Sequence, residues 1–188
     1  MSKYEEDMYG PLRGLIGSWK GGKGLDLAPE PDGTEHNPYY ETITCSAIGD
    51  VTNAESQTLA VLHYRQIVLR KSNDKVFHDQ TGYWMWDAQA GLIMYSLTIP
   101  RAVSVLAGGN HTGVLSQTGG LILEVAAGED DPDWQIIQSP FMQNNARTQG
   151  FELKITLGNN TLSYAQTTLL DIYGKVFKHT DENQLLRQ

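Results

Sequence analysis

The sequence predicts an all-β protein: a mainly antiparallel β-barrel of about ten strands with a short N-terminal helix. Short stretches rich in Val, Ile, Thr, Tyr and Trp recur between turn signals, which is typical of sandwiches and barrels. Long segments with the 3.6-residue period of helices are almost absent. Most connections have hairpin length, which favours an antiparallel meander.

The candidate strands alternate with turns rich in Gly, Asn, Asp and Ser. The strands are expected at Ser18–Leu27, Tyr40–Ala47, Thr58–Lys71, Lys75–Asp87, Leu92–Ile99, Ala102–Leu106, Leu121–Ala126, Gln135–Ser139, Arg147–Leu157 and Thr161–Tyr173. The turns are expected at 72–74, 90–91, 107–110, 129–133 and 158–160. The polar segment Ala28–Pro38 is expected to be a surface loop. Tyr9–Gly17 is expected to form the short helix, with Pro11 tolerated in its first turn.

A meander of this many strands has open edges unless the sheet closes on itself. Closure with so many strands gives an interior wide enough to hold a ligand. We therefore expect one barrel domain over residues 1–188 with a cavity for a small molecule. Residues 1–10 are a candidate for a disordered tail.

Composition limits the class of partner and the compartment. The net charge is −8, and Lys and Arg form no cluster, which argues against nucleic-acid binding. The single cysteine, Cys45, cannot form an internal disulfide, which favours a reducing compartment. The chain starts without an apolar signal region and has no apolar run of the ~20 residues that a spanning helix needs. We expect a soluble, cytoplasmic protein with no membrane partner.

The segment GSWKGGKG at 17–24 fits the first seven positions of a phosphate-binding P-loop. Gly24, however, stands where that motif requires Ser or Thr, and the preceding PLRGLI is a poor buried strand. We interpret the segment as a barrel strand whose glycines allow strong coiling and close backbone approach. Trp19 is then expected to fill one end of the interior.

No catalytic motif is present: the chain lacks H-E-x-x-H, C-x-x-C and G-x-S-x-G. His36 and His111 lie in turn-like contexts and are expected to be solvated, whereas His63 lies in the middle of a strand. Strand alternation puts His78 on the same face as Gln80. Cys45 is expected to be a small buried hydrophobe. The pattern alone predicts a ligand-binding barrel, and no spacing predicts a zinc site.

Four segments, taken in order, resemble the nitrobindin-like haem-binding β-barrels. Gly17, Ser18, Trp19 and Gly21 match the Gly-[Ser/Thr]-Trp-x-Gly of the opening strand, although Lys23 replaces a glycine of its short form. Tyr40–Thr44 is similar to the second strand of that family. Residues 76–83, VFHDQTGY, are similar to its Met-His-x-Glu-x-Gly strand, with Phe77 for the usual Met. LSYAQTTLLDIYGKVFKHTDENQLL resembles the C-terminal pattern, so the resemblance spans roughly residues 12 to 187.

This resemblance implies a barrel shaped like the fatty-acid-binding proteins that carries haem b at its mouth. It makes His179 the proximal iron ligand and puts His78 on the opposite side of the haem. Asp181 or Asn183 would accept a hydrogen bond from the ligand histidine. His78 or Gln80 would orient a small ligand, and Thr168 aligns with a pocket Met of some relatives. The implied functions are nitric oxide binding and isomerisation of peroxynitrite to nitrate by ferric haem.

The chain also departs from the family. Its segment GLDLAPEPDGTEHNPYY lacks the Tyr-Pro-Thr motif that follows the first strand and approaches the haem. A member that has lost haem is therefore an open alternative: a non-enzymatic barrel that binds a hydrophobic small molecule. A third alternative is a barrel with a filled interior that acts through partners. Barrels of this type are compatible with a homodimer, but no particular residue argues for one.

Overall fold

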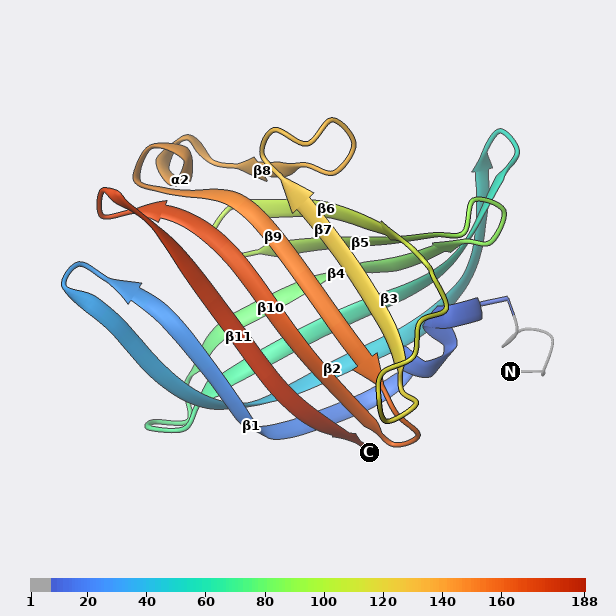
Figure 1. The fold of residues 1–188 in the computed structure, drawn as a ribbon, viewed down its shortest axis with the longest axis horizontal. Helices are drawn as coiled ribbons and strands as arrows, with labels where there is room; N and C mark the ends of the chain where they lie inside the picture. Colours follow the sequence, from blue (N-terminus) through green and yellow to red (C-terminus); the bar gives the residue numbers. More distant parts are fainter. Residues whose placement is uncertain (1–7) are drawn as a thin grey trace.

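Figure 1 shows the fold as a computed structural model, which describes residues 8–188. In this part of the chain, one sheet of 11 strands curls into a barrel accompanied by two short helices. The helices are η1 (Gly10–Leu15), a 3₁₀ helix, and α2 (Pro140–Asn145). The strands are β1 (Gly17–Glu30), β2 (Gly33–Ala54), β3 (Gln57–Arg70), β4 (Val76–Asp87), β5 (Leu92–Ile99), β6 (Val103–Asn110), β7 (Leu121–Gly128), β8 (Ile136–Gln138), β9 (Ala146–Leu157), β10 (Thr161–Ile172) and β11 (Lys175–Arg187).

The barrel closes through antiparallel pairing at two seams. β1 pairs with β11, and β5 pairs with β6 along its whole length. The strand order is β5-β4-β3-β2-β1-β11-β10-β9-β7-β6-β8. Because β8 pairs only with β6, the other ten strands form the closed ring. The predicted antiparallel barrel of about ten strands is therefore confirmed, with one extra strand.

Helix η1 and buried apolar side chains fill one end of the barrel. Trp19 is fully buried there, and its indole Nε1 donates a hydrogen bond to the Leu15 carbonyl oxygen at 2.8 Å. The Arg187 guanidinium lies 4.1 Å from the centre of the Trp19 ring and donates to the Gly14 carbonyl oxygen at 2.7 Å. The end of β11 therefore holds η1 in place, and Trp19 fills this end as its position in the sequence predicted.

The prediction of a surface loop at Ala28–Pro38 is wrong. β1 and β2 stay paired as far as Glu30 and Gly33, so only Pro31 and Asp32 form the turn of a long hairpin. Most of this extension is polar, so its strand alternation does not stand out as an alternation of apolar and polar residues. Figure 1 shows the hairpin at the end of the barrel away from η1.

The last strand, β11, was not predicted either. The chain turns at Tyr173 and Gly174, whose φ angles are 56° and 73°, and returns along β10. Two successive positive φ angles are typical of a type I′ hairpin turn, for which Tyr is an unusual first residue. His179 therefore lies within a strand and not after the last one.

Two further expectations need correction. The glycines at 107–110, expected to form a turn, lie within β6. The predicted helix over Tyr9–Gly17 is shorter and is a six-residue 3₁₀ helix. Of the predicted tail 1–10, residues 1–7 lie outside the described residues. Tyr9 is buried, and its hydroxyl accepts a hydrogen bond from the Gly49 amide at 2.9 Å. No helix within residues 8–188 combines the length and the apolar character required to cross a membrane.

Gly24 supports a testable prediction about the barrel wall. A Cβ at this buried position would overlap the ring of Tyr39, whose hydroxyl lies 2.6 Å from the Tyr164 hydroxyl and is therefore held in place. We predict that Gly24→Ala lowers the free energy of unfolding by about 1–3 kcal/mol, the usual cost of overpacking. Urea unfolding followed by tryptophan fluorescence measures this change.

Gly22→Ala is the matched control in the same strand. Gly22 is exposed, and an added Cβ would meet nothing nearer than Tyr40 Cβ at 4.0 Å. Its free energy of unfolding should change by less than about 0.5 kcal/mol. Equal effects of the two substitutions would contradict the constraint that Tyr39 imposes on Gly24.

Candidate functional site

A cavity of about 340 Å³ opens at the end of the barrel opposite η1, within the size range of small-molecule pockets. Apolar side chains cover much of its wall: Val68, Leu97, Val103, Val105, Met142 and Phe151. Polar side chains from β1, β2, β4 and β11 also line it. The interior cavity that the strand count predicted is therefore present.

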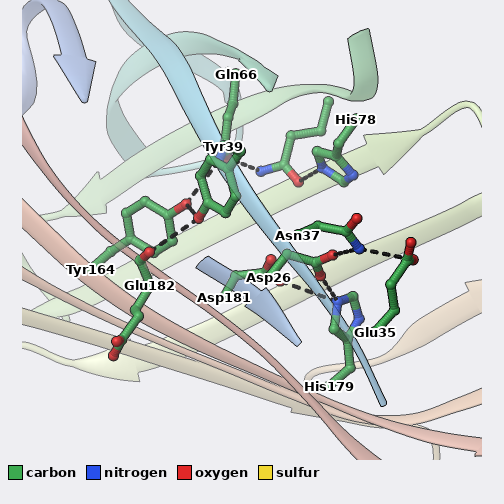
Figure 2. Close-up of polar contacts among 11 residues, drawn as sticks. Asp26, Glu35, Asn37, Tyr39, Gln66, His78, Tyr164, His179, Asp181 and Glu182 are labelled. Atoms are coloured by element: carbon green, nitrogen blue, oxygen red, sulfur yellow. Dashed lines mark hydrogen bonds and ion pairs between the residues drawn. The ribbon is translucent and has the colours of Figure 1, made fainter. Parts of the chain in front are cut away.

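The centre of the polar wall is a close contact between His179 of β11 and Asp26 of β1 (Figure 2). His179 Nε2 donates to Asp26 Oδ1 at 2.5 Å and lies 3.7 Å from Asp181 Oδ2. Asp26 is only 4% exposed, so this carboxylate is almost completely removed from water. Among the described residues, no group is hydrogen-bonded to the other ring nitrogen, Nδ1.

A β-bulge explains why Asp26 faces the interior. Simple alternation from the buried Trp19 would turn Asp26 outward. The pairing register of β1 shifts between Gly21 and Gly24, and the extra residue reverses the faces of the strand beyond it. Asp26 consequently lies on the cavity wall, directly across from Asp181 in the β1–β11 ladder.

The long β1–β2 hairpin also supplies the group that orients Asp26. Asn37 is 4% exposed, and its Nδ2 donates to Asp26 Oδ2 and to Glu35 Oε2, both at 2.9 Å. Both carboxylate oxygens of Asp26 therefore accept a hydrogen bond. Such outer hydrogen bonds fix the orientation of a carboxylate and, through it, of the imidazole that it contacts.

The charges in this cluster are strongly coupled. Burial raises the pKa of Asp26, but the hydrogen bond and the positive charge of His179 outweigh this effect, so that its pKa is lowered. Burial lowers the pKa of His179, but the hydrogen bond that it donates to Asp26 and the negative charge of Asp181 outweigh this effect and raise that pKa. Burial, with the nearby Asp26 charge, raises the pKa of Asp181 to about 7 despite the opposing charge of His179. At neutral pH the cluster therefore contains an ionised Asp26 beside a His179 whose pKa is raised above the ordinary value.

His78 lies on another part of the cavity wall and is joined to the barrel interior by hydrogen bonds. Its Nε2 donates to Gln80 Oε1 at 2.9 Å. The Gln80 amide nitrogen is 2.9 Å from Gln66 Oε1 and 3.0 Å from the Tyr95 hydroxyl. Burial lowers the pKa of His78, so this imidazole is neutral at pH 7 and acts as a hydrogen-bonding group without a charge.

A second buried acid, Glu41, lies deeper in the barrel. It is 2% exposed and accepts hydrogen bonds from Gln66 Nε2 at 2.6 Å and from Asn183 Nδ2 at 2.8 Å. Burial raises the pKa of Glu41 to about 6, although both hydrogen bonds lower it. The buried acid and its amide partners form a polar layer below the cavity.

All four residues that the sequence analysis selected line this one cavity: His179, His78, Gln80 and Thr168. Thr168 is directly opposite His179 in the β10–β11 ladder. Their roles toward a ligand remain predictions. Of the two suggested hydrogen-bond acceptors, Asp181 lies near His179, whereas Asn183 donates to Glu41 instead.

The sequence analysis missed Asp26 and Asn37, the residues that hold His179. Extending the alternation of the second strand backwards through Glu41 and Tyr39 would have put Asn37 on the inner face. No comparable signal was available for Asp26, because alternation without the bulge gives the wrong face.

The remaining histidines and the cysteine lie away from this cluster. His36 is exposed, and His63 bonds the Thr81 hydroxyl at 2.8 Å. His111 is half-buried with its ring edge against Trp86, so its expected solvation is wrong. Cys45 is buried, and burial raises the pKa of its thiol to about 12, which agrees with a small hydrophobic role.

Fold and site together define a closed β-barrel with a ligand cavity and a buried histidine–carboxylate pair at its mouth. Residues 8–187 match the family model described as the THAP4-like, heme-binding beta-barrel domain. The match covers almost the whole chain, so the protein belongs to this family, and the resemblance to nitrobindin-like barrels is confirmed.

Comparison with solved structures gives the same fold. The chain is similar to Rv2717c from M. tuberculosis, with a TM-score of 0.72 and 19% sequence identity over 97% of this chain and 99% of that one. At this identity the likeness concerns the fold alone. No curated protein matches the chain.

The types of side chain around the cavity are those that a haem site requires. A metal-binding histidine almost always donates its other ring N–H to a carboxylate, a carbonyl or water, and His179 has such a carboxylate in Asp26. One ring nitrogen then stays available to a metal. The apolar side chains of the remaining wall suit a porphyrin face.

The two aspartates of the cluster support opposite predictions for stability. The folded-state pKa of Asp181 is raised from 3.8 to about 7, so its contribution to stability is lost as pH rises through that range. We predict that Asp181→Asn unfolds at a higher urea concentration than the wild type at about pH 8, by about 1 kcal/mol or more. The same substitution should flatten the fall in stability between pH 4 and pH 7, which repeated urea titrations measure.

Asp26→Asn is expected to act in the other direction. The lowered pKa of Asp26 stabilises the fold above pH 3.8, and the raised pKa of His179 stabilises it below 6.5. Near pH 5 both contributions are present, so Asp26→Asn should lower the free energy of unfolding by about 1–3 kcal/mol. If Asp181→Asn and Asp26→Asn changed the free energy of unfolding in the same direction both near pH 5 and near pH 8, this assignment of charges would be contradicted.

Proposed function

We propose that this protein binds haem b through His179 and leaves the other face of the haem open to a small ligand. Its proposed activities are reversible nitric oxide binding and the isomerisation of peroxynitrite to nitrate. Membership of a haem-binding family supports haem as the ligand. The observation that carries the assignment to His179 is its contact with the buried Asp26 on the cavity wall.

Asp26 acts on His179 in two ways in this proposal. The hydrogen bond fixes the ring orientation, since Asn37 in turn holds the carboxylate. It also makes the imidazole more electron-rich and therefore a stronger metal ligand. The ferric haem would supply the redox and ligand-exchange chemistry.

His78 and Gln80 are proposed to bind the small ligand on the other side of the cavity. In the strand order, β4 is four positions from β11, which is almost opposite in a ring of ten. The hydrogen bond from His78 to Gln80 orients both side chains. A neutral His78 has a single N–H, which it can donate to a small anion in place of Gln80 without holding the anion as an ion pair.

The apolar wall has a separate role in this proposal. Side chains such as Phe151 and Leu97 exclude water from much of the cavity and confine reactive fragments. Thr168, beside His179 in the ladder, adds a hydroxyl to this wall. Pocket shape and hydrogen bonding are thus the contributions of the chain itself.

The second candidate function is a barrel that binds a hydrophobic small molecule without haem. One observation favours it: apolar side chains, among them Val68, Leu97 and Phe151, cover much of the cavity wall. The absence of the Tyr-Pro-Thr motif is consistent with it. Cytoplasmic location and the absence of nucleic-acid partners also remain proposals.

Hemin titration separates the two functions. We predict a saturable Soret band for the wild type and at least an about tenfold weaker affinity for His179→Ala, since an iron ligand is lost. His36→Ala is the control, because this histidine is exposed and does not line the cavity. No saturable band, or equal affinity in His179→Ala, would contradict the assignment.

Stopped-flow decay of peroxynitrite then tests the reaction. The hemin-loaded wild type should accelerate the decay, and His78→Ala should slow it by about tenfold or more, as expected for a lost hydrogen-bonding group. A Soret band without accelerated decay would leave haem binding and remove the catalytic function.

A further inference from the structure

Two arginines at the mouth of the cavity have no acidic partner among the residues that the structure describes. Arg70 ends β3 on its inner face, and Arg101 lies in the turn between β5 and β6; both line the cavity. Arg65 and Arg147, by contrast, are each paired with an acid, Asp79 at 2.7 Å and Glu129 at 3.4 Å. Within residues 8–188, neither Arg70 nor Arg101 forms an ion pair, although the chain carries a net charge of −8. Unpaired cations at a cavity mouth favour an anionic group on the ligand.

The Arg70 guanidinium is held in position while one of its donors is unused. It lies 4.8 Å from the centre of the Phe77 ring, which limits its motion. Its Nε is shielded from solvent and has no hydrogen-bond partner in the described part of the chain. A buried donor without an acceptor is costly, so a native one calls for an explanation such as a missing ligand.

The strand order separates these arginines from His179. In the ring of ten strands, β5 is five positions from β11 in either direction, so the β5–β6 turn that carries Arg101 lies across the barrel from β11. Arg70, at the end of β3, lies between them, three positions from β11. A ligand that contacts both His179 and the two arginines must therefore extend across the mouth of the cavity.

The other charges on the cavity wall restrict the kind of anion. Asp26, Glu35 and Asp181 line the same cavity and would repel a dianionic phosphate more strongly than a carboxylate. The planar fork of arginine matches a carboxylate with two parallel hydrogen bonds. The apolar wall requires that the rest of the ligand be apolar.

We propose that Arg70 and Arg101 form a carboxylate-binding site and that the cavity takes an apolar molecule with carboxylate groups at one end. If the proposed function holds, on which this part of the inference rests, the carboxylates are the two propionates of haem. Otherwise they belong to a fatty acid. The shared chemistry is a carboxylate beside an apolar body.

The test compares acids with their esters. Hemin and hemin dimethyl ester are titrated by absorbance, and a fluorescent fatty acid and its methyl ester by emission, into the full-length protein. Arg70→Gln/Arg101→Gln should bind the free acids at least about tenfold more weakly than the wild type, because it loses two charge-assisted contacts. The esters should bind both proteins equally. Arg70→Lys keeps the charge and loses the planar fork, so its affinity for the free acids should lie between those of the wild type and the double variant.

Arg65→Gln is the matched control on β3, since Arg65 pairs with Asp79 and does not line the cavity. It should bind all four probes like the wild type, and circular dichroism should show that every variant is folded. Wild-type affinity of the double variant for the acids would overturn the carboxylate site even if hemin binds. If the wild type binds the fatty acid but not hemin, the proposed function fails, and the comparison of acid and ester decides the site by itself. Binding of neither acid by the wild type would overturn both proposals.

Discussion

The site depends on one interaction, the 2.5 Å hydrogen bond between His179 and the buried Asp26. It joins the first strand of the barrel to the last, across the seam where the sheet closes. An isolated carboxylate at 4% exposure would be strongly unfavourable, and a buried imidazolium likewise. Each group is tolerated because the other is there, and Asn37 satisfies the remaining carboxylate oxygen. The bulge in β1 therefore matters as much as either side chain, because it turns Asp26 inward.

The two ends of the barrel have different roles: one is packed and stabilises the fold, and the other contains the ligand cavity. At the η1 end, Trp19, Leu15 and the Arg187 guanidinium close the interior with apolar packing and well-paired donors. At the other end, hairpin tips surround a cavity whose wall carries the buried Asp26 and two arginines that form no ion pair within residues 8–188. A small domain tolerates such groups where a ligand completes their interactions. The GSWKGGKG segment contributes to both ends of the barrel. Trp19 packs at the closed end, and Gly24 is the first residue after the bulge to lie on the same inner face as Asp26.

The sequence predicted the fold class, the closed barrel and a cavity, because hairpin spacing and strand composition are local signals. The sequence-based prediction failed where polar side chains or an unusual turn residue made a strand difficult to recognise. The extended β1–β2 hairpin was interpreted as a loop because its inner face carries Asn37 in place of an apolar residue. β11 was missed because Tyr173 takes a positive φ that usually belongs to Gly or Asn. The His179–Asp26 contact could not be predicted, because it depends on a bulge and on a pairing between residues 153 positions apart.

The most direct test of this arrangement is an NMR titration of the His179 imidazole in the wild type and in Asp26→Asn. We predict a pKa above the ordinary 6.5 in the wild type, because the contact with Asp26 outweighs burial. In Asp26→Asn the pKa should fall, because burial then acts against the charged imidazole without the full negative charge beside it. A wild-type pKa at or below 6.5, or a pKa that the substitution leaves unchanged, would contradict the pairing on which the site rests.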